Sequence, residues 1–166
     1  LEEEGLTGNF NPNHGSESGQ FSSGPSSTTF SSKTMQQKED AFLDKHVNSD
    51  DLGTQLIKDT LISQRVYGDN APNYFKITSE RNGEIVGGAH YSVHKKEGTI
   101  YLLGVLPSER GQGTGKALLK KTIKNMYAKG ARKIILQSAP GAVSFYEKFG
   151  FTHTSKNGMK LILTED

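Results

Sequence analysis

The chain has 166 residues, 33% of them hydrophobic, with no cysteine and a formal net charge of +2. This length suits one compact domain with an extension, and the lack of cysteine excludes a disulfide scaffold, a thiolate zinc site and a covalent cysteine enzyme. No stretch approaches the roughly 18 apolar residues of a membrane span, and the net charge argues neither for nor against nucleic acid as a partner.

Residues 1–34 are expected to form a flexible leader ahead of a domain over residues 35–166. Residues 15–32 contain eight Ser, three Gly and two Thr, and such a segment cannot bury enough apolar surface to offset its ordering entropy. The stretch Asn13–Gly24 resembles a short element at domain junctions of phage-encoded proteins, which implies attachment to a larger phage-encoded assembly. A plain polar linker is the alternative. The N-terminus lacks an apolar signal-peptide segment, so we expect a cytoplasmic protein or, by this resemblance, a virion-associated one.

Two helices are predicted next. Asp50 and Asp51 precede apolar residues spaced by close to 3.6, which indicates a helix that reaches Val66. A weaker pattern predicts a helix over Gln37–His46, and Asn70–Asn73 is a proline-containing loop.

Three antiparallel strands then form a meander. Tyr74–Ser79 alternates between apolar and polar residues, and Asn82-Gly83 favours a two-residue hairpin turn into Ile85–His94. Lys95–Gly98 forms a second turn into a strand over Thr99–Leu106.

A helix that ends at Gly130 follows the meander. The continuous apolar run within Lys133–Gln137 suits a strand buried on both faces, as in a parallel pairing reached through a helical crossover. A second helix over Pro140–Phe149 and a closing hairpin of Phe151–Thr154 with Met159–Thr164 complete an α+β fold with a mixed sheet.

A glycine-rich turn joins a strand to a helix at Arg110–Lys116. Glycines at 111, 113 and 115 let backbone amides approach a ligand without interference from a Cβ atom. The following helix adds four unpaired N–H groups and its positive dipole end, so the turn predicts a phosphate or pyrophosphate site.

The spacing of this turn eliminates two phosphate-binding motifs. A Walker A loop needs Gly where Arg110 stands and Ser or Thr where Ala117 stands. A dinucleotide fingerprint needs Gly where Lys116 stands and a preceding parallel strand.

The remaining pattern is Arg110-x-x-Gly113-x-Gly115, preceded by Val105-x-Pro107. It resembles the signature of the GNAT (GCN5-related N-acetyltransferase) family, Q/R-x-x-G-x-G/A after the fourth strand. Ala142–Phe151 is similar to that family's other hallmark, a helix carrying a Tyr (here Tyr146) before a Gly-Phe turn. The two motifs are joined by one predicted helix and one predicted strand, as in the family.

The resemblance implies a mixed central sheet of about six or seven strands, with flanking helices and a splayed pair, the fourth and fifth strands, that holds acyl-CoA. It implies that the backbones of Leu103 and Val105 bind the thioester and pantetheine of acetyl-CoA. The loop would hold the pyrophosphate through Arg110, Gly111, Gln112, Gly113, Thr114, Gly115 and Lys116. No metal ligand is implied.

Acyl transfer to an amine needs a deprotonated nucleophile, a stabilised oxyanion and a proton for the leaving thiolate. The resemblance assigns the Leu103 N–H as the oxyanion donor and Tyr146 as the general acid. The alternative for Tyr146 is a packing aromatic whose hydroxyl bonds a backbone group.

The general base stays open. Many family members place a Glu on the fourth strand, whereas the nearest acid here is Glu97, ahead of the predicted strand. Tyr101, His90 and His94 lie on strands near the expected cleft, and a His suits base duty near neutral pH. For each histidine an exposed strand position is the other interpretation, and an ordered water is a further candidate.

Two features depart from the family pattern. The usual Asn that opens the last helix is Ala139, and the usual first strand is absent or comes from Ser27–Lys33. The leading hypothesis is an N-acetyltransferase that moves an acetyl group from acetyl-CoA to a primary amine of a small molecule or protein. The alternatives are a non-catalytic binding or structural module of a larger phage protein, and a toxin that acetylates aminoacyl-tRNA, which the basic segment Lys116–Lys133 permits.

Overall fold

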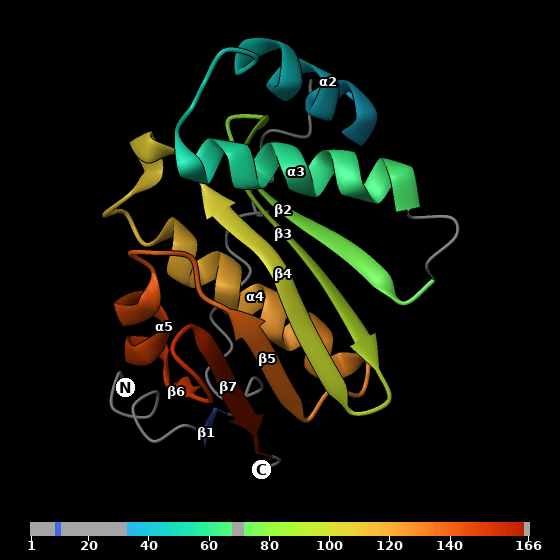
Figure 1. Ribbon diagram of the computed structural model, residues 1–166. Coiled ribbons are helices and arrows are strands. Elements are labelled where there is room, and N and C mark those ends of the chain that lie inside the picture. Colours follow the sequence, from blue (N-terminus) through green and yellow to red (C-terminus); the bar gives the residue numbers. More distant parts are fainter. Residues whose placement is uncertain (1–8, 11–32, 68–71, 165–166) are drawn as a thin grey trace. The chain divides into compact units, whose positions relative to one another are not determined.

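The computed structural model describes residues 9–10, 33–67 and 72–164 (Figure 1). They belong to two compact units. Among the described residues, unit 1 comprises 9–10, Tyr91–Tyr101 and 123–164, and unit 2 comprises 33–67, 72–90 and Leu102–Thr122. The strand order is β1-β7-β5-β4-β3-β2, with β6 paired to β7.

Unit 2 begins with two helices, α2 (Met35–Lys45) and α3 (Leu52–Tyr67). Thr34 starts α2 with a capping box, because its hydroxyl accepts from the Gln37 backbone N–H while the Gln37 side chain accepts from the Thr34 N–H. Both predicted helices are therefore present.

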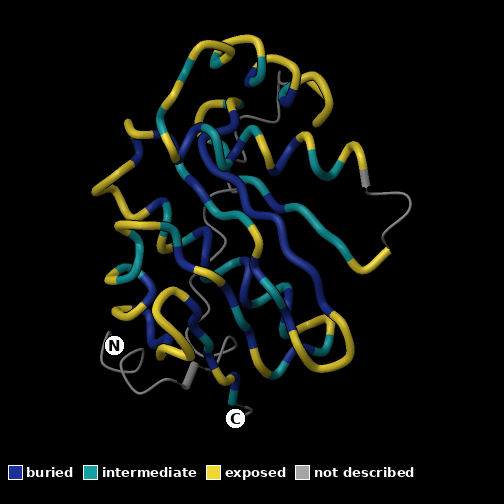
Figure 2. Tube along the Cα trace, viewed as in Figure 1, coloured by how far each residue is buried: buried dark blue, intermediate teal, exposed yellow. Residues whose placement is uncertain are grey.

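The hairpin of unit 2 joins β2 (Tyr74–Arg81) to β3 (Glu84–His94). Asn82 and Gly83 both adopt a positive φ, 55° and 81°, as a type I′ turn requires. Burial is continuous along β3 from Ile85 to Val93 (Figure 2). The predicted hairpin is confirmed.

Apolar side chains from α2, α3, β3 and the residue directly after β4 (Glu97–Val105) form the core of unit 2. Its members are Phe42, Ile57, Leu61, Ile85, Val86 and Leu106. Ile57 and Leu61 are fully buried, one turn apart on α3, and face the core. Ile62 and Val66, which belong to the same predicted apolar pattern, are exposed, so only part of the predicted face is buried. A 3-10 turn over Pro107–Glu109 leads from β4 to α4 (Thr114–Ala128).

Unit 1 is built around β5 (Lys133–Gln137), which lies between β4 and β7 (Gly158–Leu163). It pairs in parallel with β4 and antiparallel with β7, so the predicted parallel pairing is confirmed. The β4–β5 pairing runs from Glu97↔Lys133 to Ile100↔Leu136, whereas β4 itself continues to Val105.

The remaining elements of unit 1 are α5 (Val143–Phe149), β6 (Thr152–His153) and the short β1 (Asn9–Phe10), which pairs in parallel with β7. Helix α5 starts later than the predicted Pro140, because Gly141 has a φ of 85°, which a right-handed helix does not allow. It ends, as predicted, at Gly150, with a φ of 117°.

Two strand predictions need comment. The turn after β3 is shorter than expected, since β4 begins at Glu97, directly after Lys95 and Lys96. Most of the suggested first strand, Ser27–Lys33, lies outside the described residues. The α+β class with a mixed sheet is confirmed.

Candidate active site

The glycine-rich loop lies in unit 2 between the end of β4 and the start of α4. Gly111 and Gly113 adopt φ values of 80° and 81°, which favour glycine, and a Cβ atom at either would meet nothing within 4 Å. Both glycines therefore face open space, which leaves their backbone accessible to a ligand.

Backbone amides of this loop are available for an anion. The Ala117 N–H bonds to the Gly113 carbonyl at 3.0 Å, whereas the amides from Gly113 to Lys116 make no backbone hydrogen bond within the described part of the chain. Four unpaired N–H groups at the positive end of a 15-residue helix attract a phosphate group.

The guanidinium of Arg110, the first residue of the loop, is held by Asp51. Its Nη2 lies 2.9 Å from Oδ1 and 3.2 Å from Oδ2 of Asp51, and the Asp51 carboxylate also accepts from the Thr54 N–H at 3.0 Å and the Thr54 hydroxyl at 3.1 Å. Asp51 thus caps α3 and holds Arg110. Partial burial alone would raise the pKa of Asp51, but the bonds from Thr54 and Arg110 outweigh it and hold that pKa below its usual value.

The first turn of α3 rests directly on the end of β4. A Cβ atom on Gly104 would lie 2.7 Å from the Gly53 carbonyl oxygen and 2.8 Å from Leu56 Cβ, and one on Gly53 would collide with the Val105 carbonyl oxygen. Helix and strand approach backbone to backbone, so α3 bounds the strand segment Leu103–Val105 on one side.

Tyr146 lies on α5 in unit 1 and is 7% exposed. Its ring contacts those of Phe145 and Phe151 edge-on, with centroids 5.1 and 5.5 Å away. Burial raises the pKa of Tyr146 to about 12, so its hydroxyl keeps its proton at neutral pH. The loop belongs to unit 2, whereas Tyr146 belongs to unit 1.

The candidate bases differ in their surroundings. His90 is 5% exposed and stacks on Tyr74, and burial lowers its pKa. The alternative of an exposed strand position is therefore wrong for His90, whereas His94 is exposed at the end of β3. Tyr101 is 45% exposed, and its hydroxyl lies 2.9 Å from that of Ser92. The structure does not single out one of these groups.

Sequence reasoning missed three residues that shape the loop: Asp51 as the partner of Arg110, and the pair Arg81 and Glu109. Arg81 is the last residue of β2, and its guanidinium binds the Glu109 carboxylate through two hydrogen bonds of 2.8 Å. The partners in these pairs are 59 and 28 positions apart. Only the Asp51–Thr54 spacing, typical of a helix cap, carried a local signal.

In the residues that the structure describes, no helix is long and apolar enough to cross a bilayer, and no group of three or more His, Asp or Glu side chains could hold a metal ion.

The model of the acetyltransferase (GNAT) domain family matches residues 32–161, and the chain belongs to this family. Among curated proteins, the chain is similar to mycothiol acetyltransferase of Streptomyces avermitilis, with 40% identity over 81 residues, 45% of this chain and 26% of that protein. The chain thus spans about a quarter of the length of this relative.

Solved structures share the fold. A GNAT-family protein from Desulfovibrio desulfuricans has a TM-score of 0.61 at 16% identity, covering 78% of this chain and 94% of that one. A GNAT-family acetyltransferase from Brucella melitensis, solved in complex with acetyl-CoA, has a TM-score of 0.53 at 19% identity, covering 81% and 86%.

Proposed function

We propose that the protein is an N-acetyltransferase that transfers an acetyl group directly from acetyl-CoA to a primary amine of a small molecule or a protein. The observation that carries this proposal is the loop of unit 2, where a Cβ on Gly111 or Gly113 would point into open space and the amides of Gly113–Lys116 make no backbone hydrogen bond within the described residues. Membership of the acetyltransferase (GNAT) domain family agrees with it. The acetyl-CoA complex of the Brucella melitensis relative supports the choice of donor.

The donor side is assigned as follows. The amides of Gly113–Lys116 bind the pyrophosphate, whereas the Gln112 N–H already bonds the Glu109 carbonyl at 3.3 Å. Arg110 adds a positive charge beside the pyrophosphate. The backbones of Leu103 and Val105, on the part of β4 that extends beyond its pairing with β5, bind pantetheine and the thioester. Bound acetyl-CoA supplies an activated acyl group and a thiolate leaving group.

The protein's own groups move the proton and stabilise charge. As the amine nitrogen forms its bond to the acyl carbon, the Leu103 N–H stabilises the charge on the acyl oxygen. When the carbon–sulfur bond breaks, Tyr146 gives its hydroxyl proton to the sulfur. Its raised pKa, about 12, keeps this proton in place at neutral pH. The proton lost by the amine goes to a base that water or one of Tyr101, His90 and His94 supplies.

Calorimetric titration with acetyl-CoA tests the donor site, and the chain offers a matched pair of variants. Gly113 and Gly83 both have a φ of 81° with open space where a Cβ would point, so Gly113→Ala and Gly83→Ala introduce the same backbone strain of about 1 kcal/mol. We expect Gly113→Ala to weaken acetyl-CoA binding at least tenfold and Gly83→Ala to leave it unchanged. No binding by the wild-type protein at millimolar acetyl-CoA would refute the donor assignment.

An acceptor screen coupled to release of free CoA addresses the substrate, which stays open between small molecules and proteins. The same screen with aminoacyl-tRNA tests the toxin alternative, and acetyl-CoA binding without turnover on any acceptor would favour a non-catalytic module. The division into a leader (1–34) and a domain (35–166), a cytoplasmic location and attachment to a phage assembly or virion stay predictions. The leader residues behind the phage resemblance lie outside the described part of the chain.

A further inference from the structure

A buried carboxylate directly precedes the glycine-rich loop. Glu109 is 4% exposed, and it precedes the loop at the end of the 3-10 turn. Its Oε1 accepts from the Thr114 hydroxyl at 2.6 Å and from Arg81 Nη2 at 2.8 Å, and its Oε2 accepts from Arg81 Nε at 2.8 Å. The first residue of α4 and the last residue of β2 therefore meet on one side chain.

The direction of the Thr114 bond follows from charge. The bonds from Arg81 hold the pKa of Glu109 below its usual value despite its burial, so the carboxylate is ionised and can only accept. The single hydroxyl proton of Thr114 therefore points at Glu109. Thr114 can offer a ligand its backbone N–H but not, in this arrangement, its side-chain proton.

The negative charge of Glu109 is unexpected beside a loop that is proposed to bind the pyrophosphate, an anion. A carboxylate close to a pyrophosphate repels it, and a buried carboxylate is costly unless it is paired. Its three hydrogen bonds instead connect the start of α4, with its unpaired amides, to the end of β2.

We propose that Glu109, held by Arg81, is a positioning residue that fixes Thr114 and so presents the amides of Gly113–Lys116 to the pyrophosphate of acetyl-CoA. This proposal rests on the function proposed above. Glu109 acts through Thr114 and touches no substrate atom.

The variant Glu109→Gln separates positioning from simple electrostatics because the two predict opposite signs. Removing a negative charge beside an anion site would tighten CoA binding if charge alone mattered. Gln keeps one accepting oxygen, and its NH2 group must face an Arg81 donor, either Nε or Nη2. In the second orientation the Thr114 hydroxyl also has to reverse its bond and accept. The cluster is broken in either orientation, and positioning therefore predicts that the Kd for CoA rises about tenfold, the equivalent of one charge-assisted hydrogen bond.

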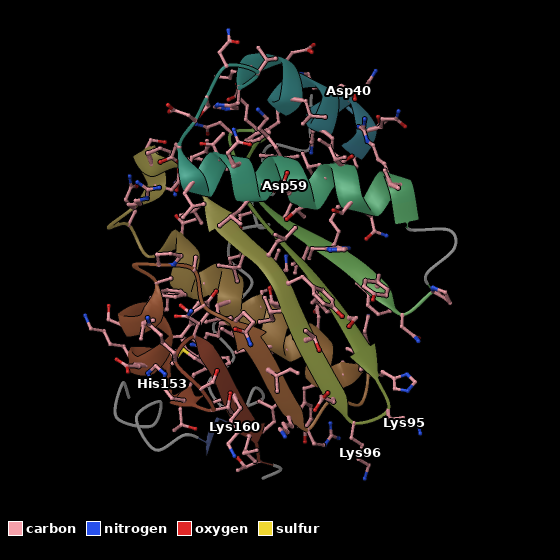
Figure 3. All side chains as sticks on the ribbon, in the orientation of Figure 1. Asp40, Asp59, Lys95, Lys96, His153 and Lys160 are labelled. Atoms are coloured by element: carbon pink, nitrogen blue, oxygen red, sulfur yellow. The ribbon has the colours of Figure 1, made fainter. Side chains whose placement is uncertain are left out.

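Glu39→Gln is the matched control. Glu39 is also buried, at 3% exposure, in the same unit, and it pairs with Arg65 at 3.2 Å and with Lys76. Its neighbour Asp40 on α2 pairs with Arg65 as well (Figure 3). We expect Glu39→Gln to lower the melting temperature to a similar degree with no change in the Kd for CoA. Equal weakening of CoA binding by both variants would overturn the proposal, because it would then reflect general loosening of the unit.

Thr114→Val provides a second test, and as a single variant it does not depend on the folding of Glu109→Gln. It keeps the backbone amide and removes the hydroxyl, so it should raise the Kd for CoA severalfold, and the double variant should bind no worse than Glu109→Gln alone. Additive losses would mean that the Thr114 hydroxyl contacts the ligand itself, and would overturn the proposal, as would unchanged or tighter binding by Glu109→Gln.

A measurement on the free protein keeps this test apart from that of the proposed function. We expect the ¹⁵N order parameters of Gly111–Lys116 to fall from about 0.85 to below about 0.6 in Glu109→Gln and to stay unchanged in Glu39→Gln. If the wild-type protein does not bind CoA, the proposed function fails and these order parameters alone decide the positioning role. Unchanged values in Glu109→Gln would then refute it.

Discussion

At the scale of the residue, Tyr146 combines a buried ring with a hydroxyl that makes no hydrogen bond to another described residue. Burial alone accounts for its raised pKa, and its packing comes from Phe145 and Phe151. A hydroxyl that bonded a backbone group, the alternative reading of this residue, would contribute to stability. A hydroxyl kept for proton transfer would contribute to rate.

The variant Tyr146→Phe separates these roles. Since the ring is retained and no described bond to the hydroxyl is lost, we expect a melting temperature equal to or slightly above that of the wild type. If Tyr146 protonates the thiolate, kcat should fall about a hundredfold, with the Kd for acetyl-CoA unchanged. Tyr127→Phe, on α4 in the same unit, keeps the ring that packs on Arg132 3.8 Å away and should leave kcat unaltered.

The pH profile of the wild-type enzyme gives a further check on Tyr146. A general acid must be protonated, and a pKa raised to about 12 extends its protonated range upward. The kcat of the wild type should therefore show no alkaline decline assignable to Tyr146 below about pH 10. A decline near pH 9 that disappears in Tyr146→Phe would contradict the raised pKa.

Asp51 offers a test of how Arg110 is used. Asn caps helices about as well as Asp, so Asp51→Asn should preserve α3 while it removes the charge that holds Arg110 at 2.9 Å. We expect acetyl-CoA binding to tighten about two- to fivefold, because Arg110 becomes free to approach the pyrophosphate and a repelling carboxylate is lost.

The control for this variant is Asp59→Asn, which removes the same charge from an exposed position of α3 (Figure 3). Titration calorimetry at two salt concentrations should show the gain only for Asp51→Asn, and less of it at high salt. Weaker binding by Asp51→Asn would mean that Asp51 presents Arg110 to the ligand.

At the scale of the element, the contact of α3 with β4 depends on two glycines. A methyl group at position 104 would meet the Gly53 carbonyl oxygen at 2.7 Å, and neither backbone can retreat without moving a whole element. We expect Gly104→Ala to lower the free energy of unfolding by about 2 kcal/mol or more and to reduce acetyl transfer, because α3 is displaced from Leu103–Val105. In Gly88→Ala, on β3, the new Cβ would make only ordinary contacts at 3.6 Å and beyond. This variant should change neither the free energy of unfolding, measured by urea titration, nor the rate of acetyl transfer.

Most elements could be predicted because their signals are local. Asn82-Gly83 specifies its turn through the backbone conformation that these two residues tolerate, and the spacing of Ile57 and Leu61 specifies the buried face of α3. The late start of α5 was not predicted, because the sequence does not show the backbone conformation of Gly141. Its φ of 85° excludes this residue from the helix.

The candidate site could be predicted only where the residues that form it are close together in the chain. The glycines of the loop, at 111, 113 and 115, lie within one short stretch of the chain, so their use could be inferred. The distant partners that hold the loop in place come from other elements: Asp51 binds Arg110 across 59 positions, and Arg81 binds Glu109, next to the loop, across 28. Ion pairs of this kind depend on how α3 and β2 are placed, which a single sequence does not specify.

At the scale of the whole molecule, histidines make stability depend on pH in a direction that the structure determines. Burial lowers the pKa of His90, and burial together with Lys45 and Lys58 lowers that of His46. Both residues therefore bind a proton less readily in the folded chain than in the unfolded chain, where the pKa of each is 6.5. His153 acts in the opposite sense, because its hydrogen bond to Glu147 at 2.7 Å raises its pKa, but this pair lies at the surface (Figure 3) and is screened by salt.

The unfolded state therefore binds more protons than the folded state as the pH falls through 6.5, and the free energy of unfolding should decrease, with a limiting slope of about 1.4 kcal/mol per pH unit for each proton. The lowered pKa values of Asp51 and Glu109 act only at more acidic pH, where protonation of these carboxylates removes their contribution. We expect the urea midpoint to be lower at pH 5.5 than at pH 7.5. Replacing His90 by Gln should reduce that difference. His153→Gln should enlarge it, because protonation of His153 favours the folded chain and this contribution is then lost. A wild-type midpoint that rises on acidification to pH 5.5 would show that the exposed His153–Glu147 pair outweighs the two histidines with lowered pKa values.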